Sequence, residues 1–224
     1  MSVHESEPSA RSRGRLIAWC SLVGVLAALG YASRFAGGKP PRNALFRYDV
    51  ALNELLLFAI VLGVVLLIAR GLPKRETFAL RPPSSWLRAL ALGLGVFVSV
   101  IVASYVFAPL HGAREQGLTP SGWEPAHAGA FAVNALAFGL LGPIVEELTF
   151  RGLGFRLLQR YGERAAIVLV GVAFGLWHGL VQALPVLTVF GIGLAYLRSR
   201  TRSLLPTIAL HVVFNGVGLA LPFL

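Results

Sequence analysis

The sequence predicts an all-α integral membrane protein, a polytopic bundle of about seven transmembrane helices, with eight as the alternative count. Three observations predict this class. Hydrophobic residues make up 56% of the 224 residues, and charged residues make up only 13%, about half the share in a soluble domain. The mean hydropathy is +0.72. The apolar residues are gathered into long uncharged runs. This pattern excludes a disordered chain and an ordinary soluble enzyme.

A transmembrane helix needs about 20 mostly apolar residues, and the runs of about that length set the predicted spans. The basic start and small-residue end of the first run resemble a signal peptide, but the six runs that follow favour an uncleaved helix. Gly142 and Pro143 allow a break in the fourth run, and Pro185 divides the short sixth run from the fifth. The predicted spans are residues 16–33, 50–69, 87–110, 128–150, 165–184, 185–197 and 203–223.

The basic residues lie between these runs, so the net charge of +10 indicates membrane topology and no nucleic-acid partner. With seven spans, 15 Lys and Arg residues fall on the side of the N-terminus and 5 fall on the other side. The positive-inside rule then places the N-terminus in the cytoplasm and the C-terminus outside. Few lysines beside many Ala, Arg and Leu residues indicate a bacterial protein, so we expect a multi-pass protein of the cell inner membrane.

Ionisable and amide side chains interrupt the apolar runs mainly in the second half of the chain. Placing a charged one at the centre of a membrane costs at least about 2.5–3.5 kcal/mol, so each indicates a function. Burying these polar side chains costs least free energy when they face one another, which predicts one water-filled cavity nearer the cytoplasmic face. These side chains are Glu146, Glu147 and Arg151 at the end of the fourth run, His178 in the fifth, and His211 and Asn215 in the seventh.

The spacing of these residues indicates how they face one another. Glu147 and Arg151 are four apart, hence on one helical face, where they can form an ion pair. Glu146 is rotated by about 100° and points elsewhere, since successive helical residues differ by that angle. His178 lies about 20 Å along its predicted span and His211 about 12 Å along its own, so straight helices do not bring them to one depth.

A carboxylate and an imidazole around one water can act as a general base, and a His–Asn face can stabilise an oxyanion. The set therefore fits amide hydrolysis. A covalent mechanism is disfavoured, because no serine or cysteine lies beside a histidine in any span as a nucleophile. Two histidines and a glutamate could also bind zinc. However, H-E-x-x-H is absent and the histidines are 33 residues apart, so we favour a site with no metal and no cofactor.

Three strings carry a resemblance to a known family. They are E-E-L-T-F-R-G from Glu146, F-G-L-W-H ending at His178, and H-V-V-F-N from His211 to Asn215. In order and spacing they resemble the E-E-x-x-x-R, F-x-x-x-H and H-x-x-x-N/B motifs of the CAAX-processing and bacteriocin-processing (CPBP, also called Abi) intramembrane endopeptidases. The resemblance covers about residues 128–220. We therefore divide the chain into N-terminal transmembrane helices and loops, 1–127, and a catalytic core, 128–224.

The resemblance implies a glutamic endopeptidase and a role for each site residue. Glu146 would activate water with the help of His178, and His211 and Asn215 would form the oxyanion site or bind the substrate backbone. Glu147 and Arg151 would hold the shape of the site. The implied partners are the lipid bilayer and a membrane-associated protein or peptide substrate, such as a protein with a C-terminal sorting tail or a CAAX-like tail.

Two other functions stay open from the residues alone. A proton-coupled transporter could relay protons through Glu146, His178 and His211, although it would predict inverted repeats, which the sequence lacks. A non-catalytic scaffold of the same fold could bind a membrane partner. Outside the motifs, Asn53 and Glu54 are predicted to anchor a helix end at the interface, and Asn134 to hydrogen-bond between helices.

Overall fold

The computed structural model describes residues 10–37, 43–108, 118, 120 and 122–223, and within these residues the chain forms helices and no strand. The all-α class is therefore confirmed. The α-helices are α1 (Ala10–Phe35), α2 (Tyr48–Ile68), α3 (Lys74–Phe78), α4 (Trp86–Val106), α5 (Ala128–Leu136), α6 (Gly142–Glu147), α7 (Phe155–Leu158), α8 (Glu163–Trp177), α9 (Leu184–Thr201) and α10 (Leu205–Ala220).

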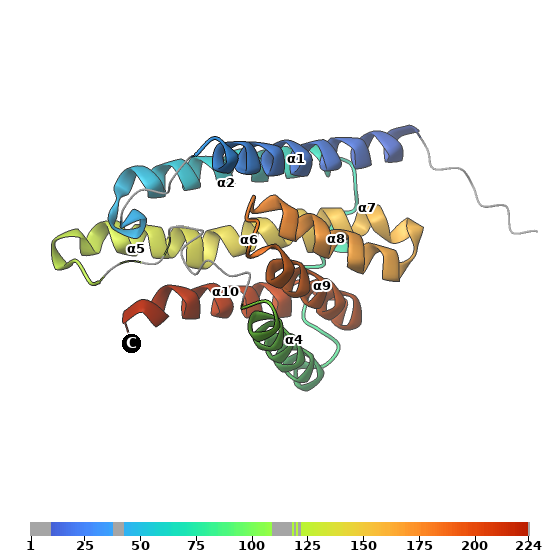
Figure 1. The fold of residues 1–224 in the computed structure, drawn as a ribbon. Coiled ribbons are helices and arrows are strands. Elements are labelled where there is room, and N and C mark those ends of the chain that lie inside the picture. Colours follow the sequence, from blue (N-terminus) through green and yellow to red (C-terminus); the bar gives the residue numbers. More distant parts are fainter. Residues whose placement is uncertain (1–9, 38–42, 109–117, 119, 121, 224) are drawn as a thin grey trace, which may run out of the picture.

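The run from α5 to α7 crosses the whole molecule and organises the bundle (Figure 1). Helices α1 and α2 lie along one side of this run, and α10 lies along the other side (Figure 1). α8 packs against α9, and α9 packs against α4. Many outward-facing side chains are large and apolar, for example Leu29, Leu67 and Leu87, which are 60%, 66% and 79% exposed. Such a surface suits a lipid environment, because lipid chains solvate it as well as a protein core would.

Among the described residues, five helical segments are long and apolar enough to cross a membrane. They correspond to the first four predicted spans and to the seventh, although residues 109 and 110 of the third span lie outside the described residues. The chain is therefore a polytopic helical membrane protein, as predicted. The five segments are Ala10–Phe35, Tyr48–Ile68, Trp86–Val106, Pro125–Tyr161 and Leu205–Phe223.

The fourth predicted span, residues 128–150, is too short at its C-terminal end. The helical run Pro125–Tyr161 has 37 residues and is unbroken at Pro143. Two π-helical segments, Ala137–Leu141 and Leu148–Gly154, join α5 to α6 and α6 to α7. A π turn is wider than an α turn, so the missing N–H of Pro143 is accommodated without ending the helix.

The fifth and sixth predicted spans differ most from the structure. α8 has 15 residues and ends at Trp177, so it is about 22 Å long, shorter than the roughly 30 Å of a bilayer core. His178 follows it, and Gly179 has a φ of +61°, a conformation that ends helices and favours glycine. α8 and α9 therefore form a hairpin that turns back inside the molecule beside α6 (Figure 1).

Small residues let this hairpin pack tightly. A Cβ on Gly191 of α9 would lie 2.6 Å from the carbonyl oxygen of Gly171 on α8, so only glycine permits this approach. α1 then holds the turn, because a Cβ on Gly179 would lie 2.8 Å from the backbone of Gly30. The Nε of Arg34 on α1 also donates to the carbonyl oxygen of Gly179 at 2.9 Å. The first helix thus fixes the position of the segment that carries His178.

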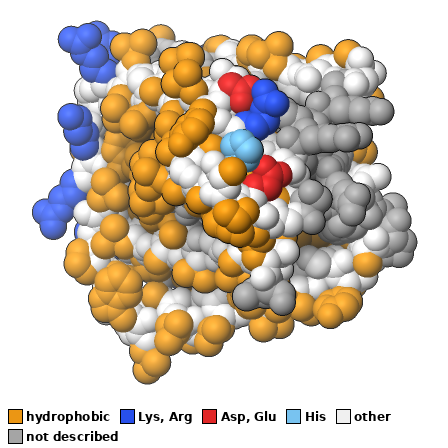
Figure 2. Space-filling view, turned by 90° about the vertical axis from the view of Figure 1, so that its left-hand side faces the viewer, with side chains coloured by type: hydrophobic (Ala, Val, Ile, Leu, Met, Phe, Trp, Pro, Cys, Tyr) orange, Lys and Arg blue, Asp and Glu red, His pale blue; other side chains and the backbone are white. Residues whose placement is uncertain are grey.

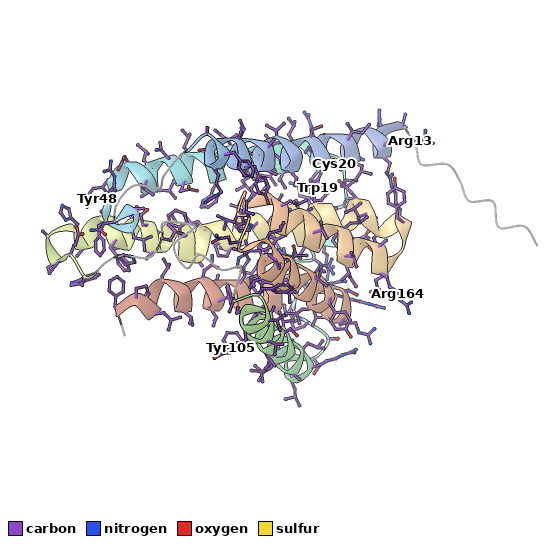
Figure 3. The ribbon with its side chains drawn as sticks, viewed as in Figure 1. Arg13, Trp19, Cys20, Tyr48, Tyr105 and Arg164 are labelled. Carbon is purple, nitrogen blue, oxygen red and sulfur yellow. The ribbon has the colours of Figure 1, made fainter. Side chains whose placement is uncertain are left out.

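Basic segments that are far apart in sequence meet at one end of the molecule. Arg13 and Arg164 lie at this end, and Tyr48 lies at the opposite end (Figure 3). Arg15 of α1 donates to the carbonyl oxygen of Arg70 after α2, and Arg81 before α4 donates to that of Arg202 after α9. Figure 2 shows the opposite end, where hydrophobic side chains dominate and charged ones are few. This asymmetry is the one that the positive-inside prediction uses.

Candidate active site

The structure brings Glu146, His178 and His211 together from three separate parts of the chain. The Oε2 atom of Glu146 on α6 lies 3.9 Å from Nε2 of His178, in the α8–α9 turn, and 3.6 Å from Nε2 of His211 on α10. The three side chains are 12%, 16% and 3% exposed. One carboxylate oxygen therefore faces two imidazole nitrogens in a largely buried setting.

The ring of His178 is oriented by its own helix. Its Nδ1 lies 2.8 Å from the carbonyl oxygen of Phe174, one turn earlier. A carbonyl oxygen only accepts hydrogen bonds, so Nδ1 carries a proton and donates it. The neutral ring then has its lone pair on Nε2, the nitrogen that faces Glu146. The Phe174 ring also packs edge-on against this imidazole, with 4.8 Å between the centroids.

His211 lies between the two adjacent glutamates. Its Nδ1 is 3.0 Å from Oε1 of Glu147, and its Nε2 faces Glu146. The rings of Phe174 and Phe190 pack edge-on against the imidazole, with centroid distances of 5.6 and 5.2 Å. The two carboxylates and two aromatic rings thus hold His211 in one orientation.

The ion pair predicted between Glu147 and Arg151 is confirmed. Nη1 of Arg151 lies 2.8 Å from Oε1 of Glu147, and both side chains are fully buried. Arg151 also donates from Nη2 to the carbonyl oxygen of Gly191 on α9 at 3.0 Å, and its guanidinium lies 4.2 Å from the ring centroid of Phe174. A buried charge needs several partners at once, and this arginine gains them by joining α6, α8 and α9.

Asn215 is the predicted site residue whose hydrogen bond is not to Glu146, His178 or His211. Its Nδ2 donates to the carbonyl oxygen of Phe138 at 2.9 Å. In the π segment that contains Phe138, the N–H of Gly142 bonds the carbonyl five residues earlier, that of Ala137. The same pattern would pair Phe138 with Pro143, which has no N–H. Asn215 supplies the missing donor and so stabilises the turn that precedes Glu146.

Further residues support the site without an obvious sequence signal. Trp19 on α1 donates from Nε1 to the carbonyl oxygen of Thr149 at 2.9 Å, and Phe150 is fully buried between the rings of Trp19 and Phe174. The carbonyl of Gly191, which binds Arg151, is a backbone group and leaves no trace in the sequence.

The polar residues outside the motifs behave differently from one another. Asn134 is buried and donates to the carbonyl oxygens of Leu45 and Arg47, so it joins α5 to the segment before α2 and not to a second membrane helix. Asn53 is exposed on α2 and Glu54 is half-buried. Among the described residues, no group of three or more His, Cys, Asp and Glu side chains is arranged to hold a metal ion.

Comparison with known proteins agrees with the motif analysis. The family model "Type II CAAX prenyl endopeptidase Rce1-like" matches residues 128–217, which contain all six site residues predicted from the sequence. The chain is 27% identical over 189 residues to the "Putative membrane peptidase YdiL" of Bacillus subtilis strain 168, covering 81% of this chain and 75% of that protein. No solved structure matches the chain. The resemblance predicted from the three motifs is therefore confirmed, because the matched residues 128–217 are the part of the chain that carries these motifs.

Proposed function

We propose that the protein is an intramembrane endopeptidase of the glutamic type, in which Glu146 activates the water that attacks a peptide bond. One observation carries this proposal: Oε2 of Glu146 faces Nε2 of both His178 and His211. The separations of 3.9 and 3.6 Å exceed direct hydrogen bonds and suit one water shared by the three groups. This is the arrangement that general-base activation of water requires.

In the proposed reaction, Glu146 takes one proton from the water while His178 orients it through the lone pair on Nε2. The oxygen attacks the peptide carbonyl carbon, and Glu146 then returns the proton to the leaving amine. His211, when protonated, donates from Nδ1 to Glu147 and keeps Nε2–H for the oxyanion that forms. A contribution of Asn215 to that oxyanion requires its Nδ2 to leave the carbonyl of Phe138.

We propose no metal and no cofactor for this chemistry, since carboxylate and imidazoles supply the base and the donor. Glu147 and Arg151 act through His211 and α9, because both are fully buried and bonded to these elements. The proposed substrates are membrane-associated proteins with a C-terminal sorting tail or a CAAX-like tail. The family model's description supports this class. We place the chain in the inner membrane with its N-terminus in the cytoplasm, which the charge asymmetry supports.

The test compares the protein termini in the membrane proteome of cells that carry the wild type, Glu146→Gln or His178→Ala. Asp49→Asn serves as a matched control, because it removes an exposed carboxylate at the start of α2. All four proteins are brought to equal levels in the membrane. New termini that vanish in both site variants and persist in the control establish the peptidase and identify its substrate.

Two outcomes would contradict the proposal. A phenotype that survives both site substitutions, with unchanged termini, would favour the non-catalytic scaffold. A phenotype that both substitutions abolish, again with unchanged termini, would favour proton transfer through the same groups, as in a transporter.

A further inference from the structure

A second polar site lies at the arginine-rich end of the molecule and shares no lining residue with the candidate active site. It is a cavity of about 320 Å³ between α3, α7, the start of α8 and the end of α9. Four arginines and two glutamates contribute to its lining, so its walls carry an excess of positive charge. These residues are Glu76, Arg81, Arg156, Arg198, Glu163 and Arg202.

Arg198 is the unusual member of this lining, because it is buried and its Nε–H has no acceptor in the described part of the chain. The residue is 8% exposed, and its Nε atom is buried with no hydrogen-bond partner. Within the described part of the chain, no carboxylate forms an ion pair with it, and its guanidinium lies 5.6 Å from the ring centroid of Phe155. Buried polar groups nearly always have a partner, and a buried charge needs one most.

The two glutamates of the cavity are already engaged elsewhere. Glu76 lies 3.6 Å from Nη2 of Arg156, and Glu163 accepts a hydrogen bond from the hydroxyl of Ser199. Burial, and then the charge of Arg81, lowers the pKa of Arg198 to about 10. Arg81 and Arg198 therefore repel each other, and among the described residues neither forms an ion pair with Glu76 or Glu163. A bound anion would relieve this repulsion.

We infer that this cavity binds a phosphate-type anion, the phosphodiester headgroup of an anionic phospholipid in the adjacent leaflet. Planar guanidinium groups bind phosphate oxygens in pairs of parallel hydrogen bonds, which suits several arginines around one cavity. Basic pockets between membrane helices on the cytoplasmic side recognise lipid headgroups in this manner.

The surroundings of the cavity favour a lipid over free phosphate. α4 begins five residues after Arg81, and its first turns present exposed apolar side chains. Trp86, Leu87 and Leu90 are 59%, 79% and 61% exposed. A phosphate held by Arg81 and Arg198 would place its acyl chains along this apolar surface of α4, which packs on the helix that carries Arg198.

The experiment uses the full chain, delipidated in a neutral detergent, and follows its thermal unfolding. The probes are short-chain phosphatidylglycerol, phosphatidylcholine with the same chains, and inorganic phosphate. We expect phosphatidylglycerol to raise the Tm in a saturable manner, and the other two probes to leave it nearly unchanged. In Arg198→Gln the concentration for a half-maximal shift should rise about 10-fold or more, as expected for a lost charge-assisted hydrogen bond.

Arg200→Gln is the matched control, because Arg200 lies on the same helix, is exposed and does not line the cavity. Arg202→Gln is a second test variant for the case that Arg198→Gln does not fold, since Arg202 is exposed and lines the cavity. It should also weaken the response. An equal shift in the wild type and both test variants, or no shift in any protein, would overturn the anion site. A full shift with inorganic phosphate alone would overturn the lipid as its ligand.

Discussion

Glu146 and His178 lie side by side because two consecutive helical segments of about equal length separate them. The first leads away from Glu146, and the second leads back to His178. The helical run continues from Glu146 to Tyr161, and the 15 residues of α8 bring the chain back from Glu163. His178 then follows at the end of α8, with its Nε2 3.9 Å from Oε2 of Glu146. The length of a helical hairpin thus sets the geometry of the candidate active site.

Glu146→Gln should abolish peptidase activity and leave the fold intact. Removing a general base lowers the rate by about 10²- to 10⁴-fold. The Oε2 atom of Glu146 has no hydrogen-bond partner in the protein, so the neutral amide should not destabilise the chain. The measurement is cleavage of an identified substrate in vesicles, together with the Tm in detergent. Activity within threefold of the wild type would assign the base to another residue.

The ion pair of Glu147 and Arg151 should show strong coupling in a double-mutant cycle. Each single substitution, Glu147→Gln or Arg151→Met, leaves one buried group without its partner and should destabilise the protein by about 3–5 kcal/mol. The double substitution should cost less than the sum of the two. Unfolding of the three variants in detergent measures this coupling. Additive losses would show that the two side chains act independently.

Gly179→Ala should lower activity by displacing His178. The substitution puts a Cβ 2.8 Å from the backbone of Gly30 and forces a side chain into a φ of +61°. A shift of about 1 Å in a catalytic group can cost about 100-fold in rate. Gly63→Ala on α2 is the control, since a Cβ there meets no atom within 4 Å. If both variants keep normal activity, α1 does not position the turn.

Asn215→Ala should reduce stability, because it leaves the carbonyl of Phe138 without a donor. A buried group that loses its hydrogen bond costs about 1–3 kcal/mol. Loss of an oxyanion donor would instead lower kcat by about 10²- to 10³-fold with little change in stability. Parallel measurement of the Tm and of kcat separates these two roles. An unchanged Tm with a large fall in kcat would place Asn215 at the reacting carbonyl.

Metal removal should leave the activity unchanged, as the proposed mechanism without a metal predicts. The purified protein is treated with 1,10-phenanthroline and with EDTA, and its metal content is measured by mass spectrometry before and after. The expected result is the same cleavage rate with less than one metal ion per chain. Loss of activity that returns on addition of zinc would show that His178, His211 and Glu146 act as ligands.

The helical membrane class, the first four predicted spans and the seventh follow from hydropathy, because long apolar runs have few alternatives to a membrane helix. The same measure ended the fourth span at residue 150, since Arg151, Arg156 and Arg160 follow it. The helix continues there because Arg151 is buried and paired inside the bundle. Hydropathy also does not locate the turn between two packed helices, so the predicted spans 165–184 and 185–197 differ in their bounds from α8 and α9.

The sequence by itself determined which residues belong to the candidate site and one contact within it, the ion pair of Glu147 and Arg151. Motif order identifies Glu146, His178 and His211, and a spacing of four residues places Glu147 beside Arg151 through local helical geometry. Only the tertiary structure decided that His211 lies between two glutamates and that Asn215 bonds Phe138. These relations depend on a π turn at Pro143 and on the depth of a hairpin, both of which arise from packing between helices. Local sequence periodicity does not encode such distances, because no single helix contains both partners.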